Sequence, residues 1–274
     1  MKSVFMMILG LCLVTGMVWG QDKADLEEGV NYIETQVYTQ EENEELLKLY
    51  KNLRVADVSD GMDAVGLPGV GLVDPSIHPD WQDFEDLSHQ FRGIAITVRY
   101  VPTQKRPLPE NLENFSQWEG EFYSKYSHEA FTELIEKGTV VVIDDVEEKD
   151  IGSIGSYNIL AWHKAGAVGV VTDASSRDTD EIAKQQVPLY LRHKGRGIRP
   201  GRNEIESVNR PVSIGGVLVC PGDVVVADGD GVVVVPRRVA QKVAEHAQKV
   251  LEGDKAGRRS LYESMGLPLD QTVE

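Results

Sequence analysis

The chain has 274 residues, of which 41% are hydrophobic and 26% charged, a composition typical of a globular protein with one or two domains. Acidic residues outnumber basic residues by 44 to 28, for a formal net charge of −16. Such acidity argues against nucleic acid or an anionic membrane surface as a partner.

The first 20 residues have the pattern of a secretory signal peptide. Lys2 provides a short positive region, and residues 4–18 are apolar and nearly uncharged. Cleavage after Gly20 would leave Cys220 as the only cysteine, which excludes an intrachain disulfide. We therefore expect an exported protein, periplasmic or secreted, with no membrane contact after cleavage. The alternative is an uncleaved N-terminal anchor.

Residues 21–40 are polar and weakly patterned, which predicts an extended arm. A helix is expected in the region 41–57, where apolar residues recur at helical spacing: Leu46, Leu49, Tyr50 and Leu53. We interpret Asp57, Asp60 and Asp63 as capping or solvated carboxylates rather than metal ligands. Residues 66–90 have loop composition, and residues 91–101 alternate as a strand does.

The stretch 102–128 combines prolines with a dense group of aromatic residues: Phe115, Trp118, Phe122, Tyr123 and Tyr126. Aromatic side chains this dense outside a clear strand predict packing onto a neighbouring subunit, with a lid over the site as the alternative. Residues 129–137 look helical, Gly138 ends that helix, and residues 139–144 predict a strand.

Residues 155–178, GSYNILAWHKAGAVGVVTDASSRD, form the most informative unit. The pattern predicts a helix that begins at Gly155-Ser156 and ends at Gly166, a covered strand over 167–172, and a polar loop. Free backbone N–H groups at the helix start can bind an anion. If the strand returns beside that start, Arg177 and Asp178 offer carboxylate recognition and a hard-metal ligand in one site. The alternative is a solvated Arg-Asp salt bridge.

One basic patch follows, formed by His193, Lys194, Arg196, Arg199 and Arg202. It either attracts a di- or tricarboxylate substrate or is a solvated loop. Residues 211–236 predict two or three short strands, and we assign Asp228 and Asp230 to a hairpin turn rather than a calcium loop. One helix is expected over about 237–251 and a second over 255–265, leading into a short tail.

Two of these segments together resemble the RraA-like family. They are residues 155–178 and residues 211–236, PVSIGGVLVCPGDVVVADGDGVVVVP. Three further stretches agree more weakly and occur in the same order along the chain as in the family: VADVSDGMDAVG, GIAITV and GTVVVID. The resemblance runs from about Leu53 to Gln248. It implies an α/β fold, the swivelling β/β/α (phosphohistidine-domain-like) layered sandwich. We expect a single domain over 41–252 with flanking helices, the insertion at about 102–128, and a C-terminal helix and tail over 253–274. Family members assemble as homotrimers or hexamers.

The resemblance also implies an activity. The family includes metal-dependent class II aldolases that act on 4-hydroxy-4-methyl-2-oxoglutarate and 4-carboxy-4-hydroxy-2-oxoadipate, and that also decarboxylate oxaloacetate. Position by position, it implies that Arg177 contacts the 2-oxo acid and that Asp178 holds Mg²⁺, or another divalent metal such as Mn²⁺, as the two catalytic residues. It also implies that the substrate carboxylate is bound by Gly155, Ser156, Tyr157 and Asn158. The expected function is a lyase of pyruvate-yielding 2-oxo acids.

Two positions differ from the family pattern. Aldolase members usually carry Glu or Asp where this chain has Ser156, and their Asp-Gly is here Asp173-Ala174. The missing acidic residue predicts impaired aldol cleavage more than lost ligand binding. One alternative is therefore a non-catalytic or divergent relative that binds an acidic small molecule. A third function, regulation of an RNA-processing enzyme, is disfavoured by the export signal and the negative charge.

Overall fold

The computed structural model describes residues 23–145 and 150–274. The expected signal peptide, residues 1–20, lies outside this range. The chain divides into two compact units, residues 1–34 and 35–274. In the first unit, the described residues include a short helix, α1 (Lys23–Glu28), within the segment predicted to be an extended arm. None of the helices in the described ranges combines the length and apolar character needed to span a bilayer.

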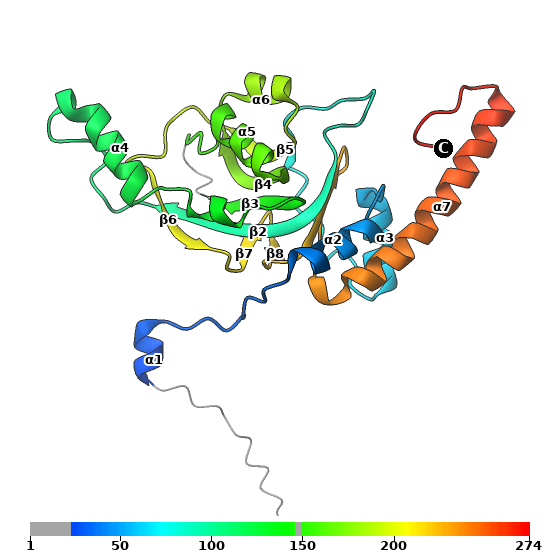
Figure 1. Cartoon of the computed structure of the whole chain (residues 1–274), viewed down its shortest axis with the longest axis horizontal. Helices are drawn as coiled ribbons and strands as arrows, with labels where there is room; N and C mark the ends of the chain where they lie inside the picture. Colours follow the sequence, from blue (N-terminus) through cyan, green and yellow to red (C-terminus); the bar gives the residue numbers. More distant parts are fainter. Residues whose placement is uncertain (1–22, 146–149) are drawn as a thin grey trace, which may run out of the picture. The chain divides into compact units, whose positions relative to one another are not determined.

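The second unit is a mixed α/β fold built on one large sheet with the strand order β1-β5-β4-β3-β2-β9-β10, in which β6 also pairs with β2 (Figure 1). Strands β2 to β5 are mutually parallel, and the other pairings in this sheet are antiparallel. β1 contacts β10, so the sheet nearly closes on itself. The strands are β1 (His78–Pro79), β2 (Phe91–Pro102), β3 (Thr139–Asp144), β4 (Ala167–Ser176), β5 (Leu189–Lys194), β6 (Asn203–Val208), β9 (Val224–Asp228) and β10 (Gly231–Val235). A separate hairpin pairs β7 (Val212–Ile214) with β8 (Val217–Val219).

The central strands are almost entirely apolar because both faces of the sheet are covered. In β3, Val140 and Val142 belong to the apolar cluster that includes the β7–β8 hairpin, whereas Val141 and Ile143 pack under α5 (Ser156–Ala165) and α6 (Thr179–Gln185). Successive side chains of a strand point to opposite faces of the sheet, so β3 contributes alternate residues to two apolar clusters.

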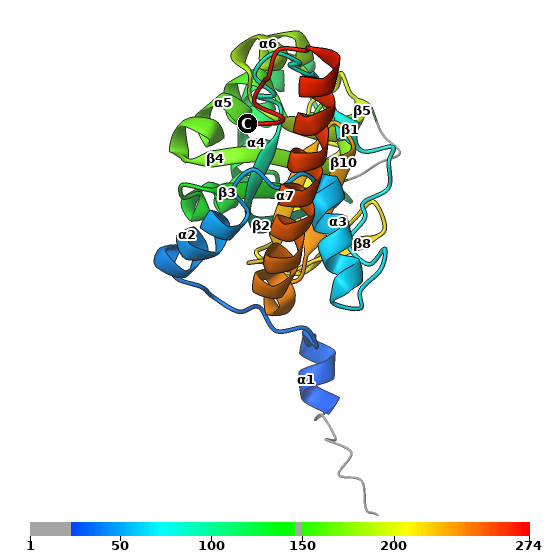
Figure 2. The same ribbon diagram turned by 90° about the vertical axis from the view of Figure 1, so that its right-hand side faces the viewer.

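A third apolar cluster joins the β9–β10 end of the sheet to three helices: α2 (Gln40–Leu49), α3 (Val55–Ala64) and α7 (Ala240–Met265). α3 and α7 run side by side (Figures 1 and 2). Val243, Ala247 and Leu251 form the buried stripe of α7, and its later turns are largely exposed.

Several boundaries differ from the predictions. The helix expected over 41–57 is two helices, because Asn52 adopts a left-handed conformation (φ +65°) between them. Residues 129–137 contain only a 3₁₀ turn, Ala130–Leu134. The two C-terminal helices are a single helix, α7, because the Cβ positions of Gly253 and Gly257 are open and the helical path continues through both.

Two interpretations of aspartates are confirmed. Asp57 accepts a hydrogen bond from the Arg54 backbone N–H (2.9 Å) and so caps α3. Asp228 accepts from the Asp230 backbone N–H (2.9 Å) in the β9–β10 turn. Residues 211–236 nevertheless form four strands, one more than the upper expectation.

Candidate active site

The end of β4 lies directly beside the start of α5. β4 continues to Ser176, four residues beyond the predicted strand, because residue 154 pairs with Ser176 as a parallel bridge. The Arg177 backbone N–H donates to the Ile154 carbonyl (2.8 Å), and the Ser176 hydroxyl donates to the same oxygen (2.8 Å). The polar loop expected over 173–178 is therefore mostly strand, and this pairing brings Arg177 and Asp178 to the helix start.

The Asp178 side chain links the end of β4 to the start of α5. Its Oδ2 accepts a hydrogen bond from the Ser156 backbone N–H (3.3 Å), and Arg177 Nε lies 3.9 Å from the same oxygen. Asp178 has a left-handed backbone (φ +59°), a conformation with a cost that is tolerated most often at functional sites. A Cβ at Gly155 would lie 3.0 Å from Asp178 Oδ2, so glycine permits the close approach.

A cavity of about 530 Å³ opens at this point, a volume within the usual range for small-ligand pockets. Of the residues predicted for the site, Gly155, Asn158 and Arg177 line it. Ser156 and Asp178 flank it through their mutual hydrogen bond. Tyr157 is 84% exposed and is not part of the lining.

Glu129 holds the first turns of α5 in place. Its carboxylate accepts hydrogen bonds from Asn158 Nδ2 (2.6 Å), Trp162 Nε1 (3.1 Å) and Arg199 Nη2 (2.5 Å). Arg199 in turn donates to the Tyr100 hydroxyl (2.8 Å). This brace connects a helix, a strand and two loops around the cavity, so the position of Asn158 depends on residues far away in the sequence.

Arg199 is buried, with a relative exposure of 6%, and its guanidinium lies 5.3 Å from the Tyr100 ring centroid and 5.4 Å from that of Tyr123. Burial lowers the pKa of Arg199, but Tyr100 and Glu129 outweigh this effect and leave the pKa above its ordinary value. Burial also raises the pKa of Tyr100, which keeps its hydroxyl neutral. The cavity wall therefore contains a buried ion pair between Arg199 and Glu129.

The predicted basic patch does not exist as one surface. Arg199 enters the cavity wall, whereas Arg196 is largely exposed and pairs with Asp150, and Lys194 pairs with Asp80 at 3.0 Å. The single residue that reaches the site was not distinguishable from its neighbours in the sequence, because all of them are basic residues in one loop-like stretch.

The aromatic insertion also reaches the site. It contains a 3₁₀ turn (Leu112–Asn114) and α4 (Phe115–Lys125). Four successive aromatic rings along α4 and just after it make tilted or edge-on contacts, with centroids 5.2–5.7 Å apart: Phe115, Trp118, Phe122 and Tyr126. Tyr123 and His128 line the cavity. This placement agrees with the alternative of a lid over the site. Sequence reasoning noticed the segment but did not identify Tyr123, His128 or Glu129 as site residues.

A buried polar network lies at the inner side of the cavity. Asn203 donates through Nδ2 to Asp145 Oδ1 (2.7 Å) and to Ser153 Oγ (3.2 Å), and its Oδ1 accepts from the Ser127 hydroxyl (3.2 Å). Ser127 and Ser153 line the cavity. The network links the insertion to the segment before α5, and satisfied buried networks of this kind hold a site rigid.

The donor set is suited to a metal that requires few protein ligands. Within residues 23–145 and 150–274, no cluster of three or more His, Cys, Asp or Glu side chains is arranged to hold a metal. The Asp178 side chain is 43% exposed and provides one accessible carboxylate. Mg²⁺ and similar hard ions bind through one or two carboxylates and keep several waters, so Asp178 fits such an ion. The same site does not fit a structural zinc ion.

The chain is similar to several known proteins. The family model described as RraA-like (Aldolase/RraA) matches residues 55–234. Protein DlpA of Legionella pneumophila is 28% identical over 201 residues, covering 72% of this chain and 28% of DlpA. A putative 4-hydroxy-4-methyl-2-oxoglutarate aldolase of Halalkalibacterium halodurans is 30% identical over 129 residues, 47% of this chain and 60% of that protein. The chain thus spans less than two thirds of the length of either relative.

A crystal structure of an uncharacterized protein from Pseudomonas syringae pv. tomato has the same fold, with a TM-score of 0.63 and 25% sequence identity over 89% of this chain and 97% of that one. The matched family segment, residues 55–234, includes both the β4–α5 site and the β9–β10 hairpin. Because the family model covers well over half of the chain, this protein belongs to the RraA-like family.

Proposed function

We propose that the protein is a divalent-metal-dependent lyase that releases pyruvate from 2-oxo acids such as 4-hydroxy-4-methyl-2-oxoglutarate or oxaloacetate. The observation that carries this proposal is the convergence of Arg177, Asp178 and the N-terminus of α5 at one cavity. Family membership supports lyase chemistry, and the name of the Halalkalibacterium halodurans relative supports an aldol-type substrate.

The cavity has the groups needed to bind a 2-oxo acid. The first N–H groups of a helix and its dipole favour a carboxylate at the start of α5. The Arg177 guanidinium offers a planar fork that suits the carboxylate and the neighbouring oxo group. Arg199 is paired with Glu129, so it holds the wall of this cavity in place and adds no net charge to it.

Carbon–carbon bond cleavage leaves an electron pair on C3, which delocalises onto the 2-oxo oxygen as the enolate of pyruvate. Donors of Arg177 directed at that oxygen stabilise the negative charge as it develops. A divalent ion held by Asp178 would supply Lewis-acid polarisation of the same oxo group. Proton delivery to C3 then completes the release of pyruvate.

The two candidate reactions require different residues. Aldol cleavage needs a base to remove the proton of the C4 hydroxyl, whereas decarboxylation of oxaloacetate releases CO₂ without removing a proton. Position 156 carries no carboxylate, and Glu129 is engaged by three donors. In aldol cleavage the proton would pass to His128, which is one of the residues that line the cavity. Decarboxylation is therefore expected to be the faster reaction.

Pyruvate release tests the proposal. The purified chain is incubated with oxaloacetate or 4-hydroxy-4-methyl-2-oxoglutarate, with Mg²⁺, Mn²⁺ or EDTA, against blanks without protein. We expect EDTA-sensitive release that is lost in Arg177→Met and retained in Arg196→Gln, which removes an exposed arginine that pairs with Asp150 outside the cavity lining. No EDTA-sensitive release from any substrate would refute the proposal.

Ser156 favours a second candidate, a relative that binds an acidic small molecule without turnover. Calorimetry with a 2-oxo acid would then show binding that depends on Arg177, while pyruvate release stays at the level of the blank. In that case Ser156→Glu, which restores the acidic residue usual in the aldolases, is expected to introduce cleavage. A variant that binds but still does not cleave would favour the binding function.

The remaining expectations are proposals of the same kind. We propose export through the N-terminal signal, self-association as a homotrimer or hexamer, and a layered architecture of the swivelling β/β/α type. The β7–β8 hairpin on one face of the sheet and the helices α5 and α6 on the other support this architecture. Mass spectrometry of the exported protein tests the first, and light scattering of the purified chain tests the second. Regulation of an RNA-processing enzyme ranks last, since the chain is strongly acidic.

A further inference from the structure

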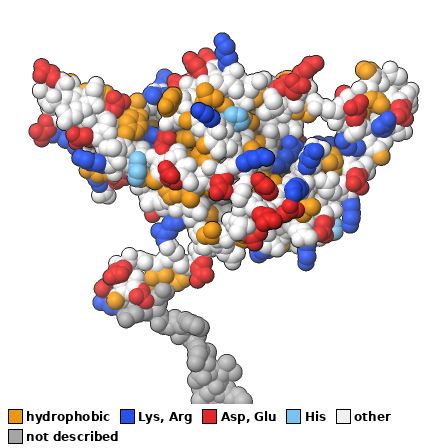
Figure 3. All heavy atoms as spheres, viewed as in Figure 1, with side chains coloured by type: hydrophobic (Ala, Val, Ile, Leu, Met, Phe, Trp, Pro, Cys, Tyr) orange, Lys and Arg blue, Asp and Glu red, His pale blue; other side chains and the backbone are white. Residues whose placement is uncertain are grey.

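A second cavity, of about 670 Å³, lies between α2, the beginning of β2 and the C-terminal end of α5. None of its lining residues is shared with the active-site cavity. Several Lys and Arg side chains lie near the middle of the face seen in Figure 3, with Asp and Glu side chains beside them. A concentration of positive charge around a cavity is notable in a chain with a formal net charge of −16.

One wall of this second cavity is apolar. Its lining includes Leu47, Phe91, Val168 and Pro188. Phe91 is held rigidly by an edge-to-face contact with Tyr190, with ring centroids 5.4 Å apart. An aliphatic or aromatic group placed against this wall would be removed from water, which is the main source of affinity for small ligands.

The other side carries cations that have no ion-pair partner among the described residues. Lys51, Arg92 and Lys137 line the cavity, and none of them forms an ion pair within the described part of the chain. Lys48, which also lines it, pairs with Glu45. The lining also contains the exposed Glu44, which Lys51, Arg92 and Lys137 outnumber. An apolar wall beside an excess of positive charge suits an amphipathic anion.

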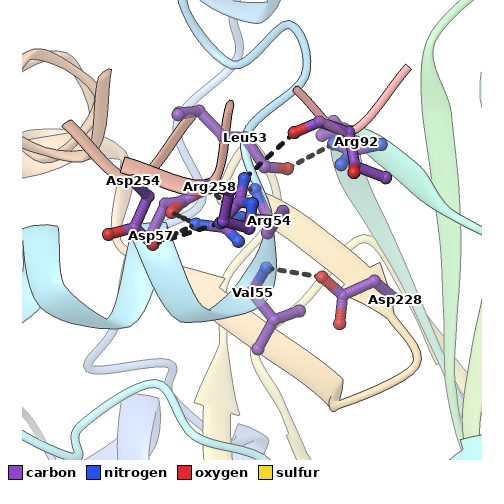
Figure 4. A network of polar contacts seen from close by, with 9 residues as sticks. Leu53, Arg54, Val55, Asp57, Arg92, Asp228, Asp254 and Arg258 are labelled. Atoms are coloured by element: carbon purple, nitrogen blue, oxygen red, sulfur yellow. Dashed lines mark hydrogen bonds and ion pairs between the residues drawn. The ribbon is translucent and has the colours of Figure 1, made fainter. Parts of the chain in front are cut away.

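Arg92 is the least exposed of these three cations, and its contacts differ from those of the neighbouring arginines. Arg54 is neutralised by Asp57 and by Asp254 (2.8 Å), and Arg258 pairs with Asp254 at 3.5 Å (Figure 4). Arg92 instead donates from Nε to the neutral carbonyl of Leu53 (2.6 Å).

The second contact of Arg92 is also to a neutral group, the side-chain oxygen of Gln90 (3.2 Å). Its Nη1 donates to no described residue. Burial lowers the pKa of Arg92, and the more distant charges of Asp228 and Asp57 only partly offset this.

We propose that this cavity is a second binding site, for a carboxylate carried on an aliphatic or aromatic body. The carboxylate lies on Arg92, with Lys51 and Lys137 nearby, and the apolar body packs against Phe91, Val168 and Pro188. The site is independent of the lyase chemistry, since it shares no residue with the cavity at Arg177.

Titration calorimetry with four probes tests the assignment: octanoate, which has both parts of the ligand, acetate and inorganic phosphate, which have only the charge, and octanol, which has only the apolar body. We expect octanoate to bind at least about tenfold more tightly than any of the others. Arg92→Gln should weaken octanoate binding about tenfold, the usual effect of losing a charge-assisted hydrogen bond.

Arg99→Gln is the matched control, because Arg99 lies on the same strand but pairs with Asp144 outside the cavity. It should change octanoate affinity less than about twofold. Lys51→Glu is a second test for the case in which Arg92→Gln does not fold: Lys51 is exposed, and reversing its charge should weaken binding while leaving stability unchanged.

Arg177→Met separates the two sites. It should abolish binding of 2-oxo acids at the active site and leave octanoate affinity at the wild-type value. Octanoate affinity that is unchanged in Arg92→Gln and Lys51→Glu would overturn the proposal, as would octanoate binding no tighter than octanol. Both of these results leave the lyase proposal intact, because its own readout is pyruvate release.

Discussion

Replacing Glu129 by Gln is the most direct test of how the site is held together. The substitution keeps the size of the side chain and removes its charge. Glu129 accepts hydrogen bonds from Asn158, Trp162 and Arg199. A glutamine amide has only one acceptor oxygen, so its NH₂ group must face at least one of these donors.

The cost follows from the burial of the partners. The side chains of Arg199 and Glu129 are 7% and 18% exposed, and removal of one partner from a buried ion pair costs about 3–5 kcal/mol. The residual exposure of Glu129 and the acceptor that glutamine keeps reduce this to about 2–4 kcal/mol of unfolding free energy. The midpoint of thermal unfolding should fall by roughly 5–10 °C in a domain of this size.

Urea unfolding at neutral pH measures the loss, with Glu133→Gln as the control because Glu133 is an exposed acid on the adjacent 3₁₀ turn. The double variant Glu129→Gln/Arg199→Met should lose clearly less than the sum of the two single variants, because neither then leaves an unpaired buried charge. A cost below about 0.5 kcal/mol for Glu129→Gln, or additive single costs, would refute the assignment of this brace.

Three further predictions concern the site and the acid range. In Gly152→Ala the new Cβ would lie 2.6 Å from Arg177 Cβ and would displace that side chain. The displacement should lower kcat/KM for pyruvate release by about tenfold to a hundredfold. Gly253→Ala is the control, because a Cβ at that position meets no other atom, and it should leave kcat/KM unchanged. Asp178→Asn should remove the EDTA-sensitive activity and alter stability by less than about 0.5 kcal/mol, because asparagine also tolerates the left-handed backbone. Hydrogen bonds from the Ser88 side chain and nearby backbone N–H groups lower the pKa of Asp83 to about 2, below the ordinary value of 3.8. Its contribution to stability is therefore complete above pH 3.8 and lost as the pH falls towards 2, so the difference in unfolding free energy between the wild type and Asp83→Asn should shrink across that range. A difference that stays constant across the range would contradict the shift.

The elements that the sequence predicted well are those with a strong local pattern. The strand over 139–144 has the predicted bounds, because a run of valines and isoleucines ending in Asp144 is apolar enough to be covered on both faces. The helix from Ser156 to Ala165 ends before Gly166, whose φ of +127° is accessible to glycine. Predictions failed where tertiary contacts determine the boundary, as at Ser176, where the bridge to residue 154 extends the strand.

The composition of the site was only partly predictable for the same reason. Arg177 and Asp178 are adjacent in sequence and 22 residues or so after the helix start, so a single helix–strand return brings them to it. Glu129 and Arg199 are separated by 70 positions, and nothing in the local pattern around either residue specifies their pairing. The same holds for Arg92: only once the surrounding side chains are in place is it visible that, among residues 23–145 and 150–274, its hydrogen-bond partners are neutral groups.

The amino-acid sequence by itself determined which segments become apolar strands, where glycines allow turns and close approaches, and that one Arg-Asp pair follows a strand near a helix start. These properties depend on side-chain periodicity and backbone freedom within a few residues. Tertiary structure alone decided that Glu129 braces Arg199 and Asn158, that the aromatic insertion lines the active-site cavity, and that Arg92 donates to the neutral oxygens of Leu53 and Gln90 beside a second cavity. These features arise because burial and charge pairing depend on distances between residues that only the closed fold brings together.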